Sequence, residues 1–382
     1  MTLINLAILF SKPTGIATYA ANLFPYLKPI EPTLLISNSA AEIWQAAKNY
    51  PCYSIPGNMT PAQGSKGHLR RLIWTQQQLP QIAKKLESRL LFSPIPEAPL
   101  YANCRFVVMV HDLIPLRFPR RFSPLTTYFR YYIPQVLQQA EQIICNSEAT
   151  AKDIVNFWGI SLDKITSIPL AYDASRFRPL DLNKVDSDSK KRYFLYLGRH
   201  DPYKNLHRVI EAFASVDCEC ELWLAGSTDK RYTPKLIIQA EELGVGDRVK
   251  FLDYVSSEQL PIIINQAISL VFPSLWEGFG LPVLEAMACG TPVITSNLSA
   301  LPEVAVDAGI LVNPYDTREI AAAMQEIAKD DNLRSQLSHL SLQRASQFSW
   351  AKTGQATVEI LRGIGNKIVS GSADGTLKIW TK

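Results

Sequence analysis

Short apolar segments alternate with longer amphipathic segments along this chain, and this alternation restricts the fold more than any other feature. The segments that read as strands are 4–10, 33–37, 105–112, 142–146, 192–198, 220–226, 248–253, 267–273 and 291–296. Their nearly continuous hydrophobicity is typical of parallel strands that are covered on both faces. Helical periodicity fills gaps between them at 204–214, 232–243, 256–265 and 316–329. The pattern predicts an α/β protein built from repeated βαβ units.

One polar stretch interrupts the alternation. Residues 171–190, AYDASRFRPLDLNKVDSDSK, have the composition of a linker, and a new strand follows them directly. A chain of 382 residues with 47% hydrophobic residues is long enough to bury two cores. We therefore expect two doubly wound domains, 1–170 and 191–348, joined by the linker 171–190. Ligands of such domains bind beyond the carboxyl ends of the strands, which here predicts a cleft between the two lobes.

The C-terminal segment changes character twice. Residues 349–362 predict a last helix, which we expect to pack back on the first domain. Residues 363–382 then alternate like a β-hairpin, with Asp-Gly at 374–375 in the turn. This tail resembles a fragment of one WD-repeat blade, with Ile-Trp at 379–380 in place of the usual Trp-Asp. One fragment cannot close a propeller, so an appendage is the preferred interpretation and an interaction module is the alternative.

Charge narrows the classes of partner. The 39 Lys and Arg residues against 35 Asp and Glu residues leave a net charge of only +4, which disfavours a nucleic-acid-binding protein. Local basic clusters lie at 68–72 and 116–122. One interpretation is that they face phosphate groups or an anionic membrane surface, and the other is that they are solvated loop ends. The first residues resemble a buried strand more than a signal peptide, and no apolar run reaches the length of a membrane span. These features predict a cytoplasmic protein whose membrane contact, if any, is peripheral.

The cysteines carry no recognisable metal-binding pattern. They are scattered mostly within apolar runs, at Cys52, Cys104, Cys145, Cys218, Cys220 and Cys289. Cys218 and Cys220 are separated by one residue, which suits neither a zinc finger nor a four-ligand site. We expect reduced, structural cysteines, as in a cytosolic protein.

Two glutamates bracket a loop where an apolar strand gives way to a helix, in LWEGFGLPVLEAMACG at 275–290. Gly278 and Gly280 permit close approach of a ligand to the backbone, and the helix start exposes amides that suit an anion. An ionised Glu285 accepts hydrogen bonds and would hold two neighbouring ribose hydroxyls. From this motif alone, an acid that merely favours the start of a helix explains Glu285 equally well.

A second motif, YLGRHDPYKNL at 196–206, places Arg199 and Lys204 after another strand. Both cations can converge on a polyphosphate, and the strand-to-helix context favours this interpretation over a salt-bridged surface pair. A third strand ends in His111 and Asp112. In isolation, this pair is better explained as satisfying loop amides.

Taken together, GRHDPYKNL and EGFGLPVLEAMACGTPVI resemble the retaining nucleotide-sugar glycosyltransferases of family 4, in which Glu277 and Glu285 match the E-x7-E signature. The resemblance extends to about residue 362 through the segments 11–23, 110–119, 147–154, 168–179 and 348–361. It implies the GT-B fold, in which two Rossmann-like domains face a cleft.

The resemblance also implies roles for individual residues. Arg199 and Lys204 would bind the donor diphosphate, and Glu285 would hold the ribose hydroxyls. Glu277 would orient the donor sugar together with the backbone amides of Gly278, Phe279 and Gly280.

In the first domain, Gly15 would bring backbone amides to the phosphate, and His111 would hydrogen-bond the donor sugar near the reacting carbon. The role of Asp112 stays open. The family often has a Gly-Gly pair where this chain has Thr14-Gly15, which leaves the shape of that loop open.

The activity that the resemblance implies is retaining transfer of a hexose from a nucleoside-diphosphate sugar, of the GDP-mannose or UDP-glucose type, to a glycan or lipid-linked acceptor. The motifs contain no Asp-x-Asp, so we expect no required metal and no further cofactor. The basic, aromatic segment 117–132 is a candidate acceptor or membrane surface, or an ordinary helix edge. The alternatives to a transferase are a GT-B nucleotide-sugar epimerase, a WD-repeat-like interaction protein and an inactive sugar-binding homologue.

Overall fold

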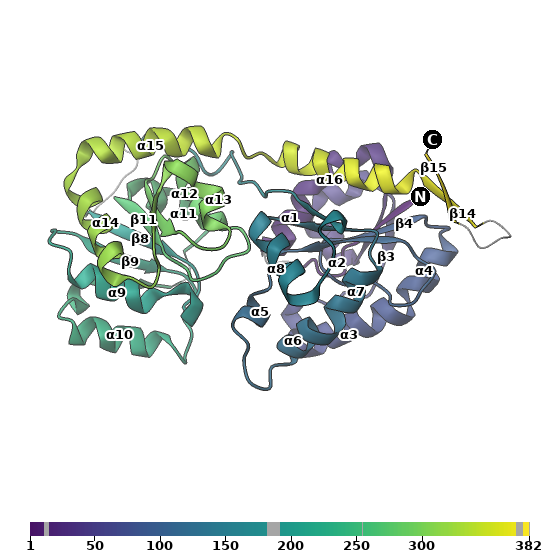
Figure 1. Cartoon of the computed structure of the whole chain (residues 1–382), viewed down its shortest axis with the longest axis horizontal. Helices are drawn as coiled ribbons and strands as arrows, with labels where there is room; N and C mark the ends of the chain where they lie inside the picture. The colour runs from purple at the N-terminus through teal and green to yellow at the C-terminus, as the bar shows by residue number, and fades with distance from the viewer. Residues whose placement is uncertain (11–14, 182–191, 254, 372–376, 382) are drawn as a thin grey trace. The chain divides into compact units, whose positions relative to one another are not determined.

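The chain folds into two compact units, each with its own parallel sheet. The computed structural model describes residues 1–10, 15–181, 192–253, 255–371 and 377–381. One unit comprises Met1–Leu170 and Trp350–Lys382, and the other comprises Ala171–Ser349 (Figure 1). The chain therefore leaves the first unit after residue 170 and returns to it at residue 350.

The first unit contains a seven-stranded sheet in the order β3-β2-β1-β4-β5-β6-β7, with every recorded pair parallel. Its strands are β1 (Thr2–Asn5), β2 (Thr33–Ile36), β3 (Cys52–Ser54), β4 (Leu90–Ser93), β5 (Phe106–Val110), β6 (Gln142–Cys145) and β7 (Ile165–Ser167). All five residues of β5 are buried, which fits a central strand covered on both faces. β5 is the fifth of the seven strands, so its end lies inside the carboxyl edge of the sheet and not at either side.

Helices cover this sheet. They are α1 (Gly15–Leu23), α2 (Asn38–Ile43), α3 (Gly64–Gln77), α4 (Leu79–Lys85), α5 (Ile114–Arg117), α6 (Pro124–Thr127), the π-helical turn η5 (Tyr128–Tyr132), α7 (Ile133–Gln139), α8 (Glu148–Trp158) and α16 (Trp350–Gly365). Short 3₁₀ turns are η1 (Phe24–Tyr26), η2 (Lys28–Ile30), η3 (Gln45–Asn49), η4 (Pro61–Gln63) and η6 (Leu162–Lys164).

The predicted last helix is α16, which packs on α1 and η1 of the first unit (Figure 1). The hydroxyl of Thr353 donates to the carbonyl of Pro169 at 2.7 Å. A Cβ at Gly354 would overlap the ring of Tyr26, so glycine permits this close approach. The segment 350–365 thereby belongs to the first unit although it follows the second unit in sequence.

The second unit contains a six-stranded parallel sheet in the order β10-β9-β8-β11-β12-β13. Its strands are β8 (Tyr193–Leu197), β9 (Glu221–Ala225), β10 (Val249–Leu252), β11 (Ser269–Phe272), β12 (Val293–Ser296) and β13 (Ile310–Val312). Because the strand order reverses between β8 and β11, the loops after these two strands diverge and leave room for a ligand.

The second unit's helices are α9 (Leu206–Ala214), α10 (Thr233–Glu242), α11 (Leu260–Gln266), α12 (Leu281–Ala288), α13 (Leu301–Ala305), α14 (Thr317–Lys329) and α15 (Asp331–Ala345). Its 3₁₀ turns are η8 (Pro202–Lys204), η9 (Gly246–Arg248) and η10 (Val306–Ala308). The side chain of Asp316 caps α14 by accepting from the amides of Arg318 and Glu319. Among the described residues, no helix has the length and hydrophobicity to cross a membrane.

Each predicted strand overlaps a strand of the structure, but the first prediction, 4–10, shares only residues 4–5 with β1. β1 ends at Asn5, and Leu6–Leu9 form a buried turn in which the amide of Leu9 donates to the carbonyl of Leu6. Hydrophobicity alone cannot separate a buried turn from a buried strand. The strands β3, β4, β7 and β13 were not predicted, because segments of three or four residues carry little periodic signal.

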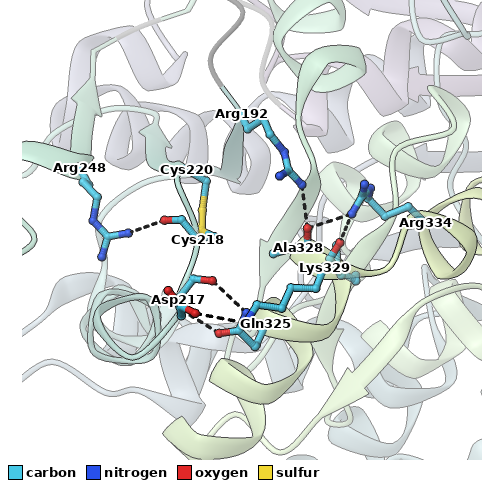
Figure 2. The surroundings of a disulfide bond; sticks show 10 residues. Arg192, Asp217, Cys218, Cys220, Arg248, Gln325, Ala328, Lys329 and Arg334 are labelled. Carbon is cyan, nitrogen blue, oxygen red and sulfur yellow. Dashed lines mark hydrogen bonds and ion pairs between the residues drawn. A yellow bond between two sulfur atoms is a disulfide. The ribbon is translucent and has the colours of Figure 1, made fainter.

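The expectation that all cysteines are reduced differs from the structure, in which Cys218 and Cys220 form a disulfide (Figure 2). The backbone bends at residues 218–219, and the two Cα atoms lie 5.4 Å apart, within the range that a disulfide spans. Asp217, just before the pair, exchanges hydrogen bonds with Gln325 of α14, and Arg248 donates to the carbonyl of Cys218 (Figure 2). The other four cysteines are free thiols.

The C-terminal tail contains the predicted antiparallel pair of strands. β14 (Lys367–Gly371) pairs with β15 (Leu377–Thr381), with Ile368 opposite Trp380 in register. The predicted turn at 374–375 lies outside the described residues. The likeness to a WD-repeat fragment stays a resemblance.

Candidate active site

The site in the second unit begins where β8 ends. After Gly198 the chain passes Arg199 and Asp201 and forms the turn η8, which ends at Lys204. The guanidinium of Arg199 pairs with the carboxylate of Asp201 at 2.7 Å, yet the Arg199 side chain stays 69% exposed. An exposed guanidinium at the carboxyl edge of a sheet is available to a phosphate group. Sequence reasoning missed Asp201 as its partner.

Lys204 reaches across to the loop after β11. Its Nζ lies 2.6 Å from Oε1 of Glu277, and both side chains are nearly buried. The ammonium also lies over the rings of Tyr203 and Phe272, at 5.3 and 5.1 Å from their centroids. Sequence reasoning placed both Lys204 and Glu277 in the site, but it did not foresee their direct ion pair.

The protonation state of Lys204 follows from this pair. Burial works to lower the pKa of Lys204, the negative charge of Glu277 works to raise it, and the net shift is upward. Arg199 is near enough that its positive charge opposes the shift. Lys204 is therefore a cation at neutral pH, and two cations stand side by side at the end of β8.

Asn205 fixes this arrangement, and sequence reasoning missed it. Its backbone has φ of 67°, and its buried side chain donates to the carbonyls of Pro273 and Pro314 at 3.0 and 2.6 Å. Asn205 therefore ties together the loops after β8, β11 and β13. The residue reads as a helix N-cap in the sequence, so no local signal shows these partners.

The glycine loop between β11 and α12 is held in one conformation. Gly280 has φ of 104°, and a Cβ there would lie 2.6 Å from Cδ2 of Leu301, so only glycine fits. The amide of Glu277 donates to the hydroxyl of Ser299 at 3.0 Å. Phe279 is buried, with its ring in edge contact with Phe348. Its side chain thus serves packing, and only the main chain of Phe279 is left for a ligand.

Glu285 lies one helical turn into α12 with a different set of charged neighbours. Burial raises its pKa to about 8, the positive charge of Arg176 opposes this shift, and the negative charge of Asp173 adds to it. The ionised Glu285 expected from the sequence is therefore mostly protonated at neutral pH without a ligand. Asp173 and Arg176 lie in the segment 168–179, whose chemistry sequence reasoning left unassigned.

In the first unit, the predicted site residue His111 directly follows β5. Its Nε2 lies 2.9 Å from the carbonyl oxygen of Pro94, which only accepts, so Nε2 carries the proton. Burial lowers the pKa of His111 to about 4. The ring is therefore neutral at pH 7, and Nδ1 is left as an acceptor for a hydroxyl.

Three further residues of the first unit belong to the predicted motifs or lie next to His111. Gly15 begins α1, and a Cβ there would meet nothing within 4 Å, while residues 11–14 of its motif lie outside the described residues. Tyr19, one turn later, packs edge-on against the His111 ring at 5.2 Å. Asp112 accepts from the amide of Ile114 at 3.0 Å, so it supports its own loop.

The structure thus brings Arg199, Lys204 and Glu277 together, groups Glu285 with Asp173 and Arg176, and places Gly15 and His111 in the first unit. Across the described ranges, no three His, Cys, Asp or Glu side chains gather as a metal site would require. The cations and backbone amides at the ends of β8 and β11 are suited to binding an anion.

Two protein-family models divide the chain between them. Residues 13–176 match Glycosyltransferase Family 4, and residues 177–341 match Glycosyl transferases group 1. The boundary between the two matches lies within the segment that follows the first unit.

Individual relatives agree with this assignment. The chain is 30% identical to the O-antigen chain mannosyltransferase B of Escherichia coli over 66% of this chain and 69% of that protein. It is 27% identical to the O-antigen chain mannosyltransferase RfbU of Salmonella typhimurium over 85% of this chain and 90% of that protein. The structure of Anabaena HepE in complex with UDP-glucose superposes with a TM-score of 0.74 at 20% identity, covering 94% of this chain and 99% of that one. The chain therefore belongs to glycosyltransferase family 4 and is a transferase with the GT-B fold of two Rossmann-like units.

Proposed function

We propose that this glycosyltransferase moves a hexose from a nucleoside-diphosphate sugar to a hydroxyl of a glycan or lipid-linked acceptor, with retention of the anomeric configuration. The observation that carries the proposal is the cluster of Arg199, Lys204 and Glu277 at the strand-order reversal between β8 and β11. A diphosphate fits there because the exposed guanidinium of Arg199 and the ammonium of Lys204, each held in place by a carboxylate, are close enough to donate to neighbouring phosphate oxygens.

The chemical problem in such a transfer is the leaving group. When the bond between the anomeric carbon and the diphosphate breaks, negative charge grows on the phosphate oxygens. Donors fixed in advance at that position stabilise the transition state most. Arg199, Lys204 and the amides at the start of α12 are such donors, and Gly15 with the amides of its loop would add to them. We therefore propose that no metal ion is needed.

Retention follows from attack on the face that the diphosphate leaves. In this route the departing phosphate oxygen takes the proton of the acceptor hydroxyl, and the acceptor oxygen forms the new bond to the anomeric carbon. Glu277 binds and orients the donor rather than attacking it, since its carboxylate is already paired with Lys204. His111 accepts a hydrogen bond from a sugar hydroxyl through Nδ1.

The donor is of the GDP-mannose or UDP-glucose type. Two relatives carry the name O-antigen chain mannosyltransferase, which favours GDP-mannose, and the HepE structure holds UDP-glucose, which favours a uridine nucleotide. The names of the two mannosyltransferases, which refer to the O-antigen chain, support a role in polysaccharide biosynthesis. The tail at 363–382 is proposed as an appendage, so deleting 365–382 leaves transfer intact.

Two measurements test the function. Thermal unfolding with a panel of nucleoside diphosphates identifies the base, because a ligand that binds the folded state raises Tm. Product analysis with the matching nucleotide sugar follows: a transferase releases free nucleoside diphosphate and forms a new α- or β-glycoside of unchanged anomeric configuration. Conversion into another nucleotide sugar without release of nucleotide would instead establish the epimerase. If no nucleoside diphosphate stabilises the protein, the proposal is wrong.

A further inference from the structure

A cavity of about 810 Å³ opens in the first unit between α3 and the segment formed by α6 and η5. Its walls are mostly apolar or aromatic, with Leu69, Leu72, Leu125, Tyr128, Tyr131 and Tyr132. None of the residues assigned above to donor binding lines it. Apolar walls of this kind receive an apolar group rather than a sugar, whose hydroxyls would need partners.

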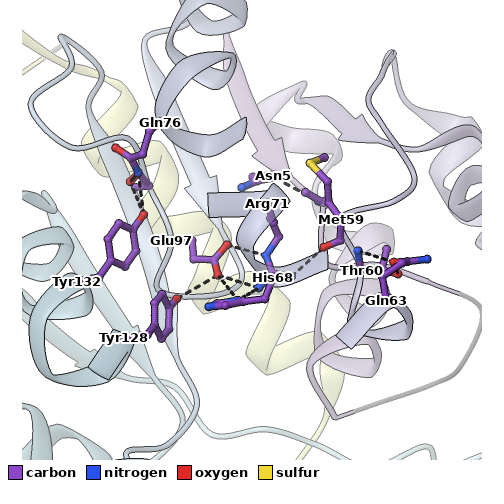
Figure 3. A network of polar contacts seen from close by, with 12 residues as sticks. Asn5, Met59, Thr60, Gln63, His68, Arg71, Gln76, Glu97, Tyr128 and Tyr132 are labelled. Carbon is purple, nitrogen blue, oxygen red and sulfur yellow. Dashed lines mark hydrogen bonds and ion pairs between the residues drawn. The ribbon is translucent and has the colours of Figure 1, made fainter. Parts of the chain in front are cut away.

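The charged groups beneath this cavity are already satisfied by one another. Arg71 and Glu97 form a two-pronged ion pair at 2.7 and 2.8 Å, and both side chains are almost fully buried (Figure 3). Arg71 also donates to the carbonyl of Met59, and the hydroxyl of Tyr128 donates to Glu97 (Figure 3). Because breaking such a buried pair is costly, Arg71 is not available to a ligand. The interior of the cavity therefore offers no unpaired charge to which a charged ligand group could bind.

The surroundings of the cavity are strongly basic. The segments 61–85 and 113–140, which contain its walls, hold nine Lys and Arg residues and no Asp or Glu, although the whole chain is only +4. Two of the nine, Arg71 and Arg117, form ion pairs with Glu97 and Asp153 of neighbouring segments. On α3, the exposed Lys66 and Arg70 form one row along the helix. Leu69 and Ile73, 58% and 48% exposed, form the adjacent row. An apolar ridge beside a basic ridge is typical of a helix that lies at a membrane surface.

The segment that carries the opposite wall shows the same combination next to the cavity. Phe122, just before α6, is 91% exposed and has φ of 59°, a region that costs a bulky residue roughly 1–2 kcal/mol. The guanidinium of Arg121 lies over its ring at 5.3 Å. Tyr131 and Arg130 in η5 are also exposed. A large aromatic side chain held in solvent by strained backbone contributes nothing to the stability of this unit, which points to a partner.

We propose that this surface, formed by α3, the 120–122 loop, α6 and η5, docks on a bilayer that contains anionic phospholipid. Phe122, Leu69 and Tyr131 enter the interface, the cavity receives part of a lipid chain, and the surrounding Lys and Arg residues face the headgroups. A second copy of this chain would bring two basic surfaces together, and a polysaccharide would leave the apolar walls unpaired. The inference rests on the proposed function only in that a lipid-linked acceptor would be met at such a surface.

The experiment is sedimentation of the full-length protein with vesicles, without donor or acceptor. Binding is expected with vesicles of about 30 mol% phosphatidylglycerol in phosphatidylcholine, and little with phosphatidylcholine alone, because each basic residue near an anionic surface strengthens binding. Phe122→Ser is expected to lower the partition coefficient about tenfold. The double variant Arg121→Gln/Arg130→Gln is expected to lower it about twentyfold, and added salt should weaken binding of the unaltered protein.

Matched controls come from the same unit. Leu162→Ser removes an apolar side chain that is 61% exposed and lies outside the proposed surface. Lys28→Gln/Lys48→Gln removes two exposed positive charges that also lie outside it. The Leu162 control should bind vesicles like the unaltered protein, and the lysine control should lose at most about a third as much affinity as the arginine pair. Equal losses in variants and controls would overturn the proposal, as would absence of binding to anionic vesicles. A dimer in solution that Phe122→Ser dissociates would assign the surface to a second copy. Nucleotide-induced stabilisation, measured without vesicles, reports separately on the proposed transferase function.

Discussion

Lys204 and Glu277 lie 73 positions apart in the sequence, and their side chains meet with 2.6 Å between Nζ and Oε1. They follow two neighbouring strands, β8 and β11, whose carboxyl ends share one edge of the sheet. The pair therefore holds a cation at the strand-order reversal before any ligand binds, which avoids reorganisation when charge develops on a leaving diphosphate.

Lys204→Ala removes that cation. We expect turnover to fall by about 10²- to 10³-fold, the usual effect of losing one donor aimed at a developing negative charge. Lys235→Ala is the matched control, because Lys235 is exposed on α10 and should leave turnover unchanged. Steady-state kinetics with the identified donor provide the measurement. A Lys204→Ala enzyme with near-normal kinetics would remove the diphosphate role from this residue.

Glu277→Gln tests the other partner and separates two effects. Without the Glu277 charge, Lys204 faces a diphosphate with no paired carboxylate competing for it, so free nucleoside diphosphate should bind at least as tightly as before. Transfer should nevertheless fall by about 10²-fold, because the carboxylate that orients the sugar is lost. Calorimetry with the nucleotide and kinetics with the nucleotide sugar distinguish the two. Parallel losses in both measurements would mean that Glu277 merely supports the fold of the loop.

Glu285 makes donor binding depend on pH. In the free protein its pKa is about 8, and ribose hydroxyls prefer an ionised acceptor, so binding must release a proton below that pH. Affinity should rise by up to about tenfold per pH unit towards pH 8 and then level off. The intact nucleotide sugar is the probe, because its diphosphate does not titrate there. Glu285→Gln should flatten the profile and bind more weakly above pH 8; an unchanged slope would assign the titration to another group.

The same shift predicts an effect on stability. Because the pKa of Glu285 is higher in the folded state than in the unfolded chain, folding binds an extra proton between about pH 4.5 and pH 8. The stability linked to this proton is present below that range and is lost as pH rises through it. The Glu285→Gln variant has no proton to lose at this position. Without nucleotide, its Tm should therefore decline less between pH 5 and about pH 8 than the Tm of the unaltered protein.

Much of this arrangement could be predicted from the sequence because its causes are local. Buried parallel strands read as apolar runs, and Gly278 and Gly280 mark a tight loop before a helix. The long-range contacts could not be predicted in this way. Asn205 bonds to carbonyls 68 and 109 positions away, and nothing in YKNL distinguishes such a residue from an ordinary N-cap.

The protonation states of the site residues could not be predicted from the sequence either. The same glutamate is an ordinary acid when exposed and keeps its proton to higher pH when it is shielded from water, and the shielding of the half-buried Glu285 depends on the packing of α12. The Cys218–Cys220 disulfide was missed for a related reason. Spacing argued against a metal site, but only the bend at residues 218–219, which brings the two Cα atoms to 5.4 Å, shows that the two side chains can meet.

Asn205 is a positioning residue, and its variants separate backbone from side chain. Asn205→Gly keeps the left-handed conformation but leaves two buried carbonyls unpaired, at a cost of about 1–3 kcal/mol each. We expect a lower Tm and a lower kcat with a smaller change in the nucleotide Kd. Asn22→Gly, which removes a single local bond, is the control. If kcat stays normal while Tm falls, Asn205 serves stability alone.

Gly280→Ala adds one methyl group to the loop that precedes α12. It forces φ of 104° on a residue with a Cβ and places that Cβ 2.6 Å from Leu301, so we expect destabilisation of about 1–3 kcal/mol and weaker donor binding. Gly363→Ala provides the contrast, because its Cβ would meet nothing within 4 Å inside α16 and the change should stabilise that helix slightly. Urea unfolding measures both variants. Adding Leu301→Ala to Gly280→Ala relieves the overlap but not the backbone strain, so stability should not be restored and donor binding should stay weak; full recovery of donor binding would show that the loop's backbone conformation is not what the ligand requires.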